Sequence, residues 1–142
     1  MIDPRVIEAA GAFIAGVGYC TLSLIDLDGY PTAATITPSR IDGIASIRFC
    51  TGLGSNWAKR IERDRRACVC FNSDAPARNV TLVGKIEILT DPEEKARAWY
   101  DGMGMYFNGP EDPAYCVLRF RTKRYSIMLS ESEGSARGTI EE

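Results

Sequence analysis

The sequence predicts a mainly β protein, an antiparallel barrel with two or three helices inserted between its strands. Six to seven short apolar segments, several alternating with polar residues, recur along the chain and are typical of half-buried strands. Tight turns such as Asp28-Gly29 and Asp42-Gly43 join some of these segments, which favours antiparallel pairing. Because a strand-rich chain exposes unpaired edges unless it closes, we expect one barrel domain from these 142 residues.

The N-terminal half begins with a helix that has a clear start signal. Asp3 is a favoured N-cap, Pro4 suits the first helical position, and apolar residues recur at helical spacing as far as Val17. A hairpin and a third strand follow, and Ser55 then begins a short basic helix. The predicted elements are a helix over 4–17, strands over 19–26, 30–38 and 44–51, and a helix over 55–62.

The C-terminal half contains four more predicted strands and one helix. Gly84 marks a point where a long strand bends, and Asp91-Pro92 followed by two glutamates predicts a helix start. This helix is expected to carry Trp99 and Tyr100 and to stop before 102. The other expected elements are strands over 67–72, 79–89, 114–121 and 124–129, a proline-containing loop over 73–78, and a polar, frayed tail from 130.

Charge and composition limit the classes of function. The net charge of −2 provides no global attraction to nucleic acid or to an anionic membrane. No apolar run approaches the roughly 20 residues that span a bilayer. The first residues lack the basic and apolar regions of a signal peptide. We therefore expect a cytoplasmic protein without a nucleic-acid or membrane partner.

Cysteine and histidine usage exclude several kinds of chemistry. The five cysteines form no CxxC pair, and their odd number in a chain without an export signal indicates free thiols. Cys68 and Cys70 fall on one face of a strand, where buried small hydrophobic residues are favoured over a metal site. Histidine is absent, which excludes Ser-His-Asp and Cys-His hydrolases and also zinc or haem held by histidine. No metal site is predicted.

The most informative segment runs from Phe49 to Arg60, where a strand enters a glycine-bearing loop and then a helix. Backbone N–H groups at a helix N-terminus attract anions, and glycines let the main chain approach phosphate oxygens. Thr51 and Ser55 add hydroxyl groups, and Lys59 adds charge one turn later. The segment is neither a P-loop nor a Rossmann fingerprint. An ordinary serine-capped helix with a solvated basic face is an equally open interpretation.

Two other regions are candidates for holding the flat part of a ligand. The strand over 33–37 has small residues against which a ring can lie, although an ordinary core strand has the same pattern. An aromatic cluster near the later helix either lines a pocket or packs in the core, and glycines 102, 104 and 109 suggest a mobile lid there. The cluster consists of Trp99, Tyr100, Tyr106 and Phe107.

Taken in order, these segments resemble the pyridoxamine 5′-phosphate oxidase-like flavin-binding split barrels, and the small general-stress-protein type in particular. The likeness extends from the first helix to the final strand. It includes Phe49-Cys50-Thr51 followed by Ser55 and the basic helix, the strand over 67–71, Leu82-Val83-Gly84-Lys85-Ile86-Glu87-Ile88, Trp99, and Phe107-Asn108-Gly109-Pro110-Glu111-Asp112-Pro113.

The resemblance implies a six-stranded antiparallel split β-barrel over residues 1–130, with a polar C-terminal tail over 131–142. It also implies a homodimer with two FMN sites at the subunit interface. By position, the isoalloxazine would be flanked by Ala34, Thr35, Ile36 and Thr37, and its edge would be bonded by the backbone of Phe49, Cys50 and Thr51. The phosphate would be held by Ser55, Asn56 and Lys59. Trp99 would come from the partner chain.

Two departures from the family pattern matter for function. Trp57 occupies a position where family members usually carry a basic residue, which leaves Lys59 or Arg60 as the available substitute. True pyridoxamine phosphate oxidases use an Arg-x-His near the C-terminus for substrate. Because this chain has no histidine, vitamin B6 oxidation is disfavoured.

The leading functional interpretation is an FMN-dependent oxidoreductase acting on a small, unidentified organic substrate, with the flavin performing the redox chemistry. No catalytic acid or base stands out from the sequence. A non-catalytic flavin-binding or flavin-sensing protein is one alternative. A barrel that takes a deazaflavin or haem is another, and haem would need a Cys, Met or Tyr ligand here. The last alternative is an empty, degenerate site, which Trp57 favours.

Overall fold

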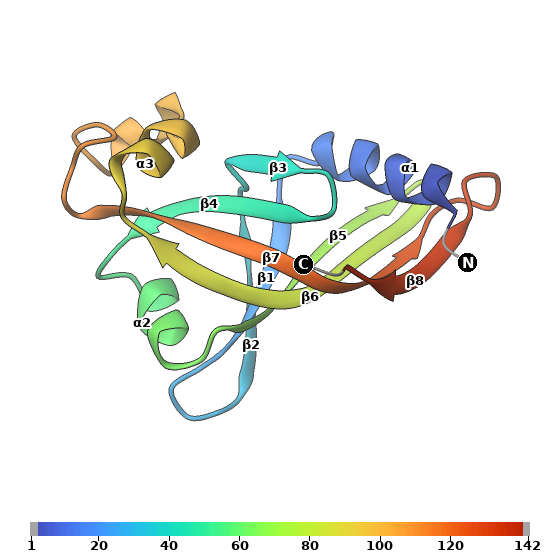
Figure 1. The fold of residues 1–142 in the computed structure, drawn as a ribbon, viewed down its shortest axis with the longest axis horizontal. Helices are drawn as coiled ribbons and strands as arrows, with labels where there is room; N and C mark the ends of the chain where they lie inside the picture. Colours follow the sequence, from blue (N-terminus) through green and yellow to red (C-terminus); the bar gives the residue numbers. More distant parts are fainter. Residues whose placement is uncertain (1–2, 141–142) are drawn as a thin grey trace.

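The computed structural model describes residues 3–140 and shows eight strands with three α-helices and one 3₁₀ helix among them (Figure 1). Most elements confirm the predicted order, with ends shifted by a few residues. In chain order they are α1 (Pro4–Ala15), β1 (Cys20–Ile25), β2 (Pro31–Ile36), β3 (Arg40–Asp42), β4 (Ser46–Gly52), α2 (Asn56–Arg63), β5 (Arg66–Asp74), β6 (Ala77–Leu89), α3 (Pro92–Ala98), η1 (Asp101–Met105), β7 (Tyr115–Met128) and β8 (Ser135–Thr139).

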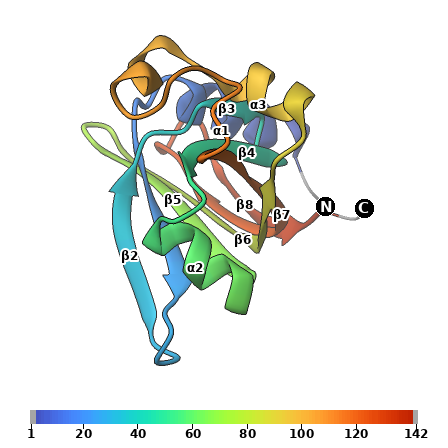
Figure 2. The same cartoon turned by 90° about the vertical axis from the view of Figure 1, so that its left-hand side faces the viewer.

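All eight strands belong to one antiparallel sheet. The order across it is β2-β1-β5-β6-β7-β4-β3, and β8 pairs with β7 outside this path. The sheet coils around the core, with the β1–β2 hairpin projecting beyond it (Figure 2). The two end strands of the order, β2 and β3, do not pair with each other. The barrel is therefore split, as the resemblance implied.

Alternation along the strands builds the core. On β1, Cys20, Leu22 and Leu24 are buried while the residues between them are half-exposed. The same alternation on β4 buries Phe49 completely. Helix α1 covers the core with Val6, Ala10 and Ile14, and its predicted N-cap Asp3 accepts a hydrogen bond from the backbone N–H of Arg5 at 2.9 Å.

Strand β6 bends where the sequence suggested. The pairing of β6 with β7 shifts register between Val83 and Gly84, which leaves Lys123 as an extra residue on β7. A β carbon on Gly84 would lie 1.9 Å from the carbonyl oxygen of Arg121. Only glycine allows this close approach, so Gly84 is the residue that permits the bulge.

The C-terminal part of the chain differs from expectation in two ways. The strands predicted over 114–121 and 124–129 are one strand, β7, because Thr122 and Lys123 form a bulge rather than a turn. The predicted frayed tail contains β8, which pairs with β7 over Arg124–Met128. Strand β4 covers the same edge of β7 only as far as Arg121, so β8 satisfies backbone groups that are otherwise unpaired.

Two smaller predictions were wrong, and one short strand was missed. The helix expected to carry Trp99 and Tyr100 ends at Ala98, and Trp99 takes an extended conformation as its C-cap. The loop predicted over 73–78 is only the two-residue turn Ala75-Pro76, because β5 continues to Asp74 and β6 begins at Ala77. The short strand β3 was not predicted, since its three residues carry no clear pattern. With β3 and β8 added, the sheet has eight strands among the described residues, not six or seven.

The cysteines are all free thiols, as predicted. Burial raises the pKa of Cys20 to about 12 and that of Cys116 to about 11, so both are protonated core residues at neutral pH. Cys68 and Cys70 are only half-buried and lie on the outer face of β5, opposite the buried Val69. The prediction that this pair is buried in the core was therefore wrong.

Candidate functional site

A cavity of about 400 Å³ lies where the ends of β2 and β4 meet the segment that contains η1. This volume is within the ~300–1,000 Å³ typical of small-molecule sites. None of its lining side chains is charged. We call it the aromatic cavity; its lining residues are Thr35, Ile36, Thr37, Cys50, Thr51, Gly52, Tyr100, Met103, Tyr106 and Phe107.

Strand β4 offers main-chain groups to the aromatic cavity. The carbonyl of Arg48 accepts a hydrogen bond from the backbone N–H of Ser39 at 2.8 Å, and the pairing of β3 with β4 ends at this residue. Because the backbone groups of successive residues point to opposite edges of a strand, those of Cys50 point to the same edge as those of Arg48. The N–H and C=O of Cys50 therefore lie at an edge that β3 does not cover, where a planar ligand with polar groups on its rim can bond to them.

Tyr115 supports the aromatic side of the cavity from beneath. Its ring centroid lies 5.3 Å from that of Trp99 in an edge-on arrangement and 5.5 Å from that of Phe107. Its buried hydroxyl donates to the carbonyl of Lys95 at 2.8 Å, and the Lys95 ammonium donates to the carbonyl of Asp112 at 2.9 Å. These contacts tie α3 to the loop before β7 and fix the position of Phe107.

Two tyrosines line the aromatic cavity, and Tyr100 is the one that is partly buried. Burial raises the pKa of its hydroxyl, and the nearby Cys50 and Tyr106 raise it further. The group therefore stays protonated at neutral pH. It offers the cavity a neutral hydrogen-bond donor and no charge.

The N-terminus of α2 lies next to β4 along the chain and is capped as the sequence predicted. Ser55 Oγ accepts from the backbone N–H of Ala58 at 3.1 Å and from Thr51 Oγ1 at 3.1 Å. A second cavity, of about 220 Å³, lies between this helix and the β1–β2 turn. We call it the α2 cavity; it is lined by Asp26, Leu27, Asp28, Asn56, Lys59 and Arg60.

The α2 cavity combines two cations with two carboxylates. Asp26 Oδ1 accepts hydrogen bonds from the backbone N–H groups of Asp28 and Tyr30, both at 2.9 Å, so this carboxylate serves the turn. Lys59 and Arg60 form no ion pair among residues 3–140, where oppositely charged atoms within 4.0 Å would count as one. Their charges are available to an anion.

The structure brings together seven of the twelve residues proposed for cofactor binding. Five of them line the aromatic cavity: Thr35, Ile36, Thr37, Cys50 and Thr51. Asn56 and Lys59 line the α2 cavity. Ser55 is the N-cap beside it, so its Oγ already serves the helix.

The other four residues lie outside both cavities. Phe49 is fully buried, so its side chain belongs to the core. Trp57 packs against the core and blocks neither cavity. Ala34 is exposed on β2. Trp99 packs on Tyr115, and its carbonyl accepts from Arg40 Nη2 at 3.2 Å. Contact between Trp99 and a ligand across a subunit interface stays a prediction.

Several lining residues are not among the twelve proposed for cofactor binding. Tyr100, Tyr106 and Phe107 were noticed as an aromatic cluster, and their nearness to the glycines at 102 and 104 was the available signal for a pocket wall. Met103 and Gly52 carried no such signal. Arg60 was considered only as a substitute for Lys59, and nothing in the sequence placed the β1–β2 turn beside α2.

Comparison with known proteins identifies the family to which this chain belongs. Residues 6–128 match the family described as pyridoxamine 5′-phosphate oxidase, and the chain belongs to this family. A curated pyridoxine/pyridoxamine 5′-phosphate oxidase of Thermobifida fusca (strain YX) is 35% identical over 89 residues. The match covers 63% of this chain and only 40% of that relative.

Solved structures with the same fold include members of the general-stress-protein group. A protein of Clostridium acetobutylicum related to general stress protein 26 superposes with a TM-score of 0.83 at 23% identity, covering 98% of this chain and 97% of that one. General stress protein 26 of Bacillus anthracis str. Sterne has a TM-score of 0.79 at 19% identity, covering 94% and 99%. A haem-binding protein of Mycobacterium smegmatis has a TM-score of 0.77 at 20% identity, covering 98% and 60%. At these identities the likeness establishes the fold.

Proposed function

We propose that this protein binds FMN, with the isoalloxazine in the aromatic cavity and the phosphate in the α2 cavity. The observation that carries the proposal is the pairing of these two cavities on consecutive elements. Thr51 lines the uncharged cavity and Asn56 lines the α2 cavity, which contains the cations Lys59 and Arg60, unpaired among residues 3–140. The Thr51–Ser55 hydrogen bond connects the two segments. A ligand with a flat ring and an anionic tail fits such a pair.

Each residue then has a defined task in holding the cofactor. The backbone of Cys50 bonds the polar rim of the ring, while Tyr100 and Phe107 limit the access of water to it. Lys59 and Arg60 neutralise the phosphate, and Asn56 places the start of α2, with its partial positive charge, in the wall of the same cavity. When bound, FMN supplies the redox chemistry, and the protein contributes binding, orientation and electrostatics.

The activity we propose is a flavin-dependent oxidoreduction of a small organic molecule, at the part of the aromatic cavity that the ring leaves open. Oxidation of pyridoxamine phosphate itself is disfavoured because the chain lacks histidine. A flavin-binding protein without turnover is distinguished by tight FMN binding and by the absence of NAD(P)H consumption with a panel of acceptors.

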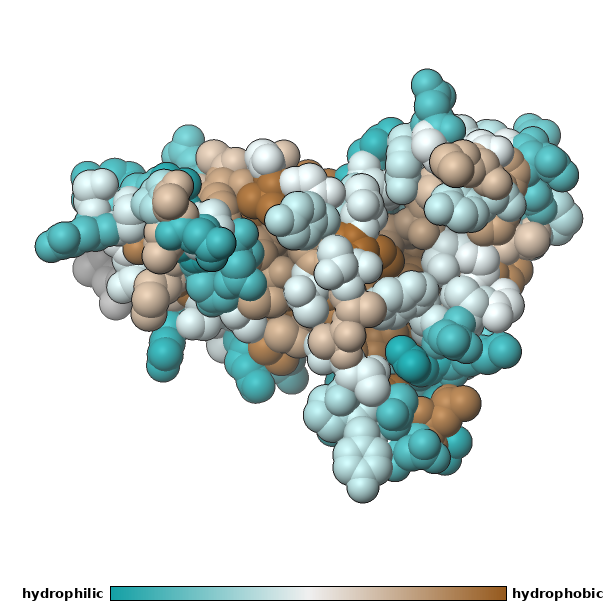
Figure 3. All heavy atoms as spheres, turned by 180° about the vertical axis from the view of Figure 1, so that it is seen from behind, coloured by the Kyte–Doolittle hydropathy of each residue, from teal (hydrophilic) through white to brown (hydrophobic). Residues whose placement is uncertain are grey.

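A homodimer is part of the proposal, and the outer face of the sheet supports it. In register across β1, β5 and β6 lie two rows of uncharged, half-buried residues, Ser23-Cys68-Val83 and Thr21-Cys70-Thr81. The face of the molecule seen in Figure 3 is likewise apolar along its middle and hydrophilic at its ends. Uncharged contiguous surface of this kind is typical of subunit contacts. Thr81→Arg should therefore convert a dimer to a monomer in light scattering.

The test of FMN binding is the visible spectrum of the purified protein, followed by titration with FMN. We expect the two-banded flavin spectrum, or its appearance when FMN is added to colourless protein. Lys59→Ala should weaken FMN binding about tenfold, because a charged hydrogen bond contributes about 1.5–3 kcal/mol. Arg63→Ala is the matched control, since this exposed residue of α2 lines neither cavity. Protein that gains no flavin, or an unchanged affinity in Lys59→Ala, contradicts the proposed site.

A haem-binding protein is the second candidate, and the composition of the aromatic cavity favours it as an alternative. Cys50, Tyr100 and Met103 line that cavity, and these are the residue types that ligate haem iron when histidine is absent. A sharp Soret band in place of the flavin bands would identify a haem protein. A single deazaflavin band would identify the remaining alternative, a barrel that binds a deazaflavin.

A further inference from the structure

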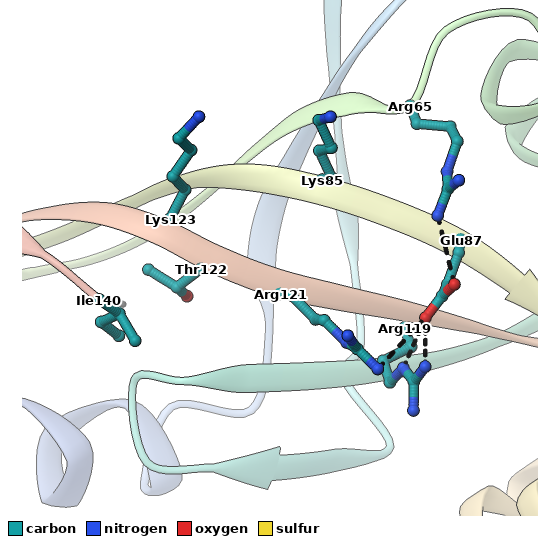
Figure 4. Close-up of a pocket in the computed structure, with 8 residues that line it drawn as sticks. All are labelled: Arg65, Lys85, Glu87, Arg119, Arg121, Thr122, Lys123 and Ile140. Atoms are coloured by element: carbon teal, nitrogen blue, oxygen red, sulfur yellow. Dashed lines mark hydrogen bonds and ion pairs between the residues drawn. The ribbon is translucent and has the colours of Figure 1, made fainter. Parts of the chain in front are cut away.

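A third cavity lies on the outer side of β6 and β7, and it shares no lining residue with the two described above. It measures about 520 Å³ and is the most strongly charged of the three. We call it the basic pocket (Figure 4); its lining residues are Arg65, Lys85, Glu87, Arg119, Arg121, Thr122, Lys123 and Ile140.

The charge in this pocket contrasts with that of the whole chain. Five cationic side chains face a single carboxylate, Glu87, although the protein carries a net charge of −2. Like charges at this density repel one another and weaken folding unless an anion offsets them. A bound anion would therefore offset the repulsion within this local excess of cations.

Glu87 organises the arginines without neutralising the pocket. It pairs with Arg119, lies 3.2 Å from Arg65 Nη2 and 3.8 Å from Arg121 Nη2. Burial on its own raises the pKa of Glu87, but the Arg119 hydrogen bond and the three guanidinium charges outweigh burial and lower it. The carboxylate thus stays ionised and holds three guanidinium groups close together, with N–H donors to spare.

The two lysines are free of this cluster. Lys85 and Lys123 are exposed and form no ion pair within the described part of the chain, residues 3–140. Figure 4 shows both side chains extending to the same side of β6 and β7, while Arg65, Arg119 and Arg121 converge on Glu87. The pocket therefore presents a cluster of three guanidinium groups and, apart from this cluster, two ammonium groups.

Alternation along the paired strands β6 and β7 is what places these groups on one surface. Alternation along β7 directs Arg119 and Arg121 outward and Phe120 and Thr122 inward. Lys123 continues this alternation outward, and the register shift leaves Arg124 outward as well, so that Tyr125 returns to the core. Four of the five cations lie on the paired strands β6 and β7, so most of the basic surface is formed before any ligand arrives.

We propose that the basic pocket binds the polyphosphate group of a small metabolite, of the nucleoside di- or triphosphate class. A single phosphate engages one cluster of donors, whereas two or three linked phosphates can contact the guanidinium groups and the ammonium groups together. The cavity volume is suited to a small molecule, and the net negative charge of the chain disfavours nucleic acid as the occupant.

The experiment is calorimetric titration of the purified protein with pyrophosphate, ADP, ATP and orthophosphate in magnesium-free buffer. We expect pyrophosphate or the nucleotides to bind at least about tenfold more tightly than orthophosphate, and the affinity to fall as salt rises from about 50 to 200 mM. Equal affinity for pyrophosphate and ADP assigns recognition to the polyphosphate alone, and tighter ADP binding adds contacts to the nucleoside. Both results support the proposal.

The variant K85A/K123A locates the binding. Neither lysine takes part in an ion pair among residues 3–140, so the variant should fold, and its melting temperature verifies this. We expect its affinity for pyrophosphate to fall at least about tenfold, while FMN binding is unchanged. Arg63→Ala removes an exposed charge outside the pocket and should leave both affinities within about twofold. Lys59→Ala should weaken FMN and not pyrophosphate.

Three results overturn the proposal. The first is no binding, or binding of orthophosphate as tight as that of pyrophosphate. The second is loss of pyrophosphate affinity in Lys59→Ala with none in K85A/K123A, which moves the site to the α2 cavity. The third is a change of oligomeric state in K85A/K123A without a change in affinity, which makes the pocket a subunit contact. Because the FMN titration is read separately, failure of either proposal leaves the other testable.

Discussion

The two halves of β7 show how one strand serves two surfaces of opposite chemistry. Tyr115, Cys116, Val117 and Leu118 are buried in succession, so both faces of the strand are covered there. Beyond Leu118 the outer side of the strand is open, and Arg119 and Arg121 occupy it. The first half supports the uncharged aromatic cavity, and the second half forms the floor of the basic pocket.

The difference arises from what lies over each half. Helix α3 and the loop after it pack on the first half through Trp99 and Phe107. Charged groups cannot be buried beneath such a cover without large cost, so the covered half is apolar. The uncovered half faces water, where arginines are tolerated and can gather around Glu87. The cover therefore decides which kind of ligand each end of the strand can hold.

The largest expected effect on stability comes from substituting Phe49, a residue of β4 whose ring is buried in the core. Phe49→Ala should lower the free energy of unfolding by about 3–5 kcal/mol, because a fully buried ring is replaced by a void. Denaturant unfolding measures this loss. Phe49→Leu retains most of the volume, and the folded variant should bind FMN as the wild type does. A loss of FMN affinity in Phe49→Leu would instead assign the Phe49 side chain to the ligand.

Gly84→Ala tests whether the basic pocket depends on the bulge. The added carbon would overlap the Arg121 carbonyl, so β6 and β7 must move apart locally, at a cost of about 3 kcal/mol. We expect a lower melting temperature together with weaker pyrophosphate binding. Gly18→Ala is the control, because a β carbon there has no atom within 4 Å. If Gly84→Ala were as stable as Gly18→Ala, the bulge would not require glycine.

Glu87→Gln should separate stability from anion binding. Loss of the carboxylate removes the nearer of the two carboxylate partners of Arg119 and should cost about 1 kcal/mol, since both groups are partly exposed. It also removes the negative charge from the basic pocket, so pyrophosphate affinity should rise about twofold or more. Thermal melts and calorimetry measure the two quantities. A variant that is less stable and also binds pyrophosphate less tightly would show that arginine placement matters more than charge.

The smallest effect is a pH dependence at the turn before β8, the strand that leads to Ile140 at the edge of the basic pocket. The Arg78 hydrogen bond, followed by that of the Ser130 hydroxyl, lowers the pKa of Glu133 from 4.5 to about 2. A lowered pKa stabilises the folded state above about pH 4.5, and this contribution is lost as the pH falls toward 2.

Unfolding measured across this pH range checks the assignment to Glu133. The stability difference between the wild type and Glu133→Gln should shrink as the pH falls below 4.5. The exposed Glu131 provides a control, and Glu131→Gln should follow the wild-type curve. A constant difference between the wild type and Glu133→Gln at every pH would assign the effect to packing.

The sequence by itself determined most of the elements and part of the site. Local signals were sufficient where they act over a few residues, as for the Asp3 and Ser55 caps, the Asp28-Gly29 turn and the alternation on β1. The segments around Thr35 and Cys50 were predicted from small residues and from the family pattern. Only the fold brings these two segments to one cavity.

Tertiary structure alone decided the remaining features, because they depend on contacts between residues far apart in the chain. Strand β8 forms because β4 leaves part of an edge of β7 unpaired. No local pattern in residues 135–139 predicts a strand there. Phe49 and Trp57 belong to the core because of what packs against them. The basic pocket joins Arg65, Lys85 and Arg121 across three segments through the register of β6 with β7. The register of the strands decides which side chains become neighbours, and this register cannot be predicted from a single sequence.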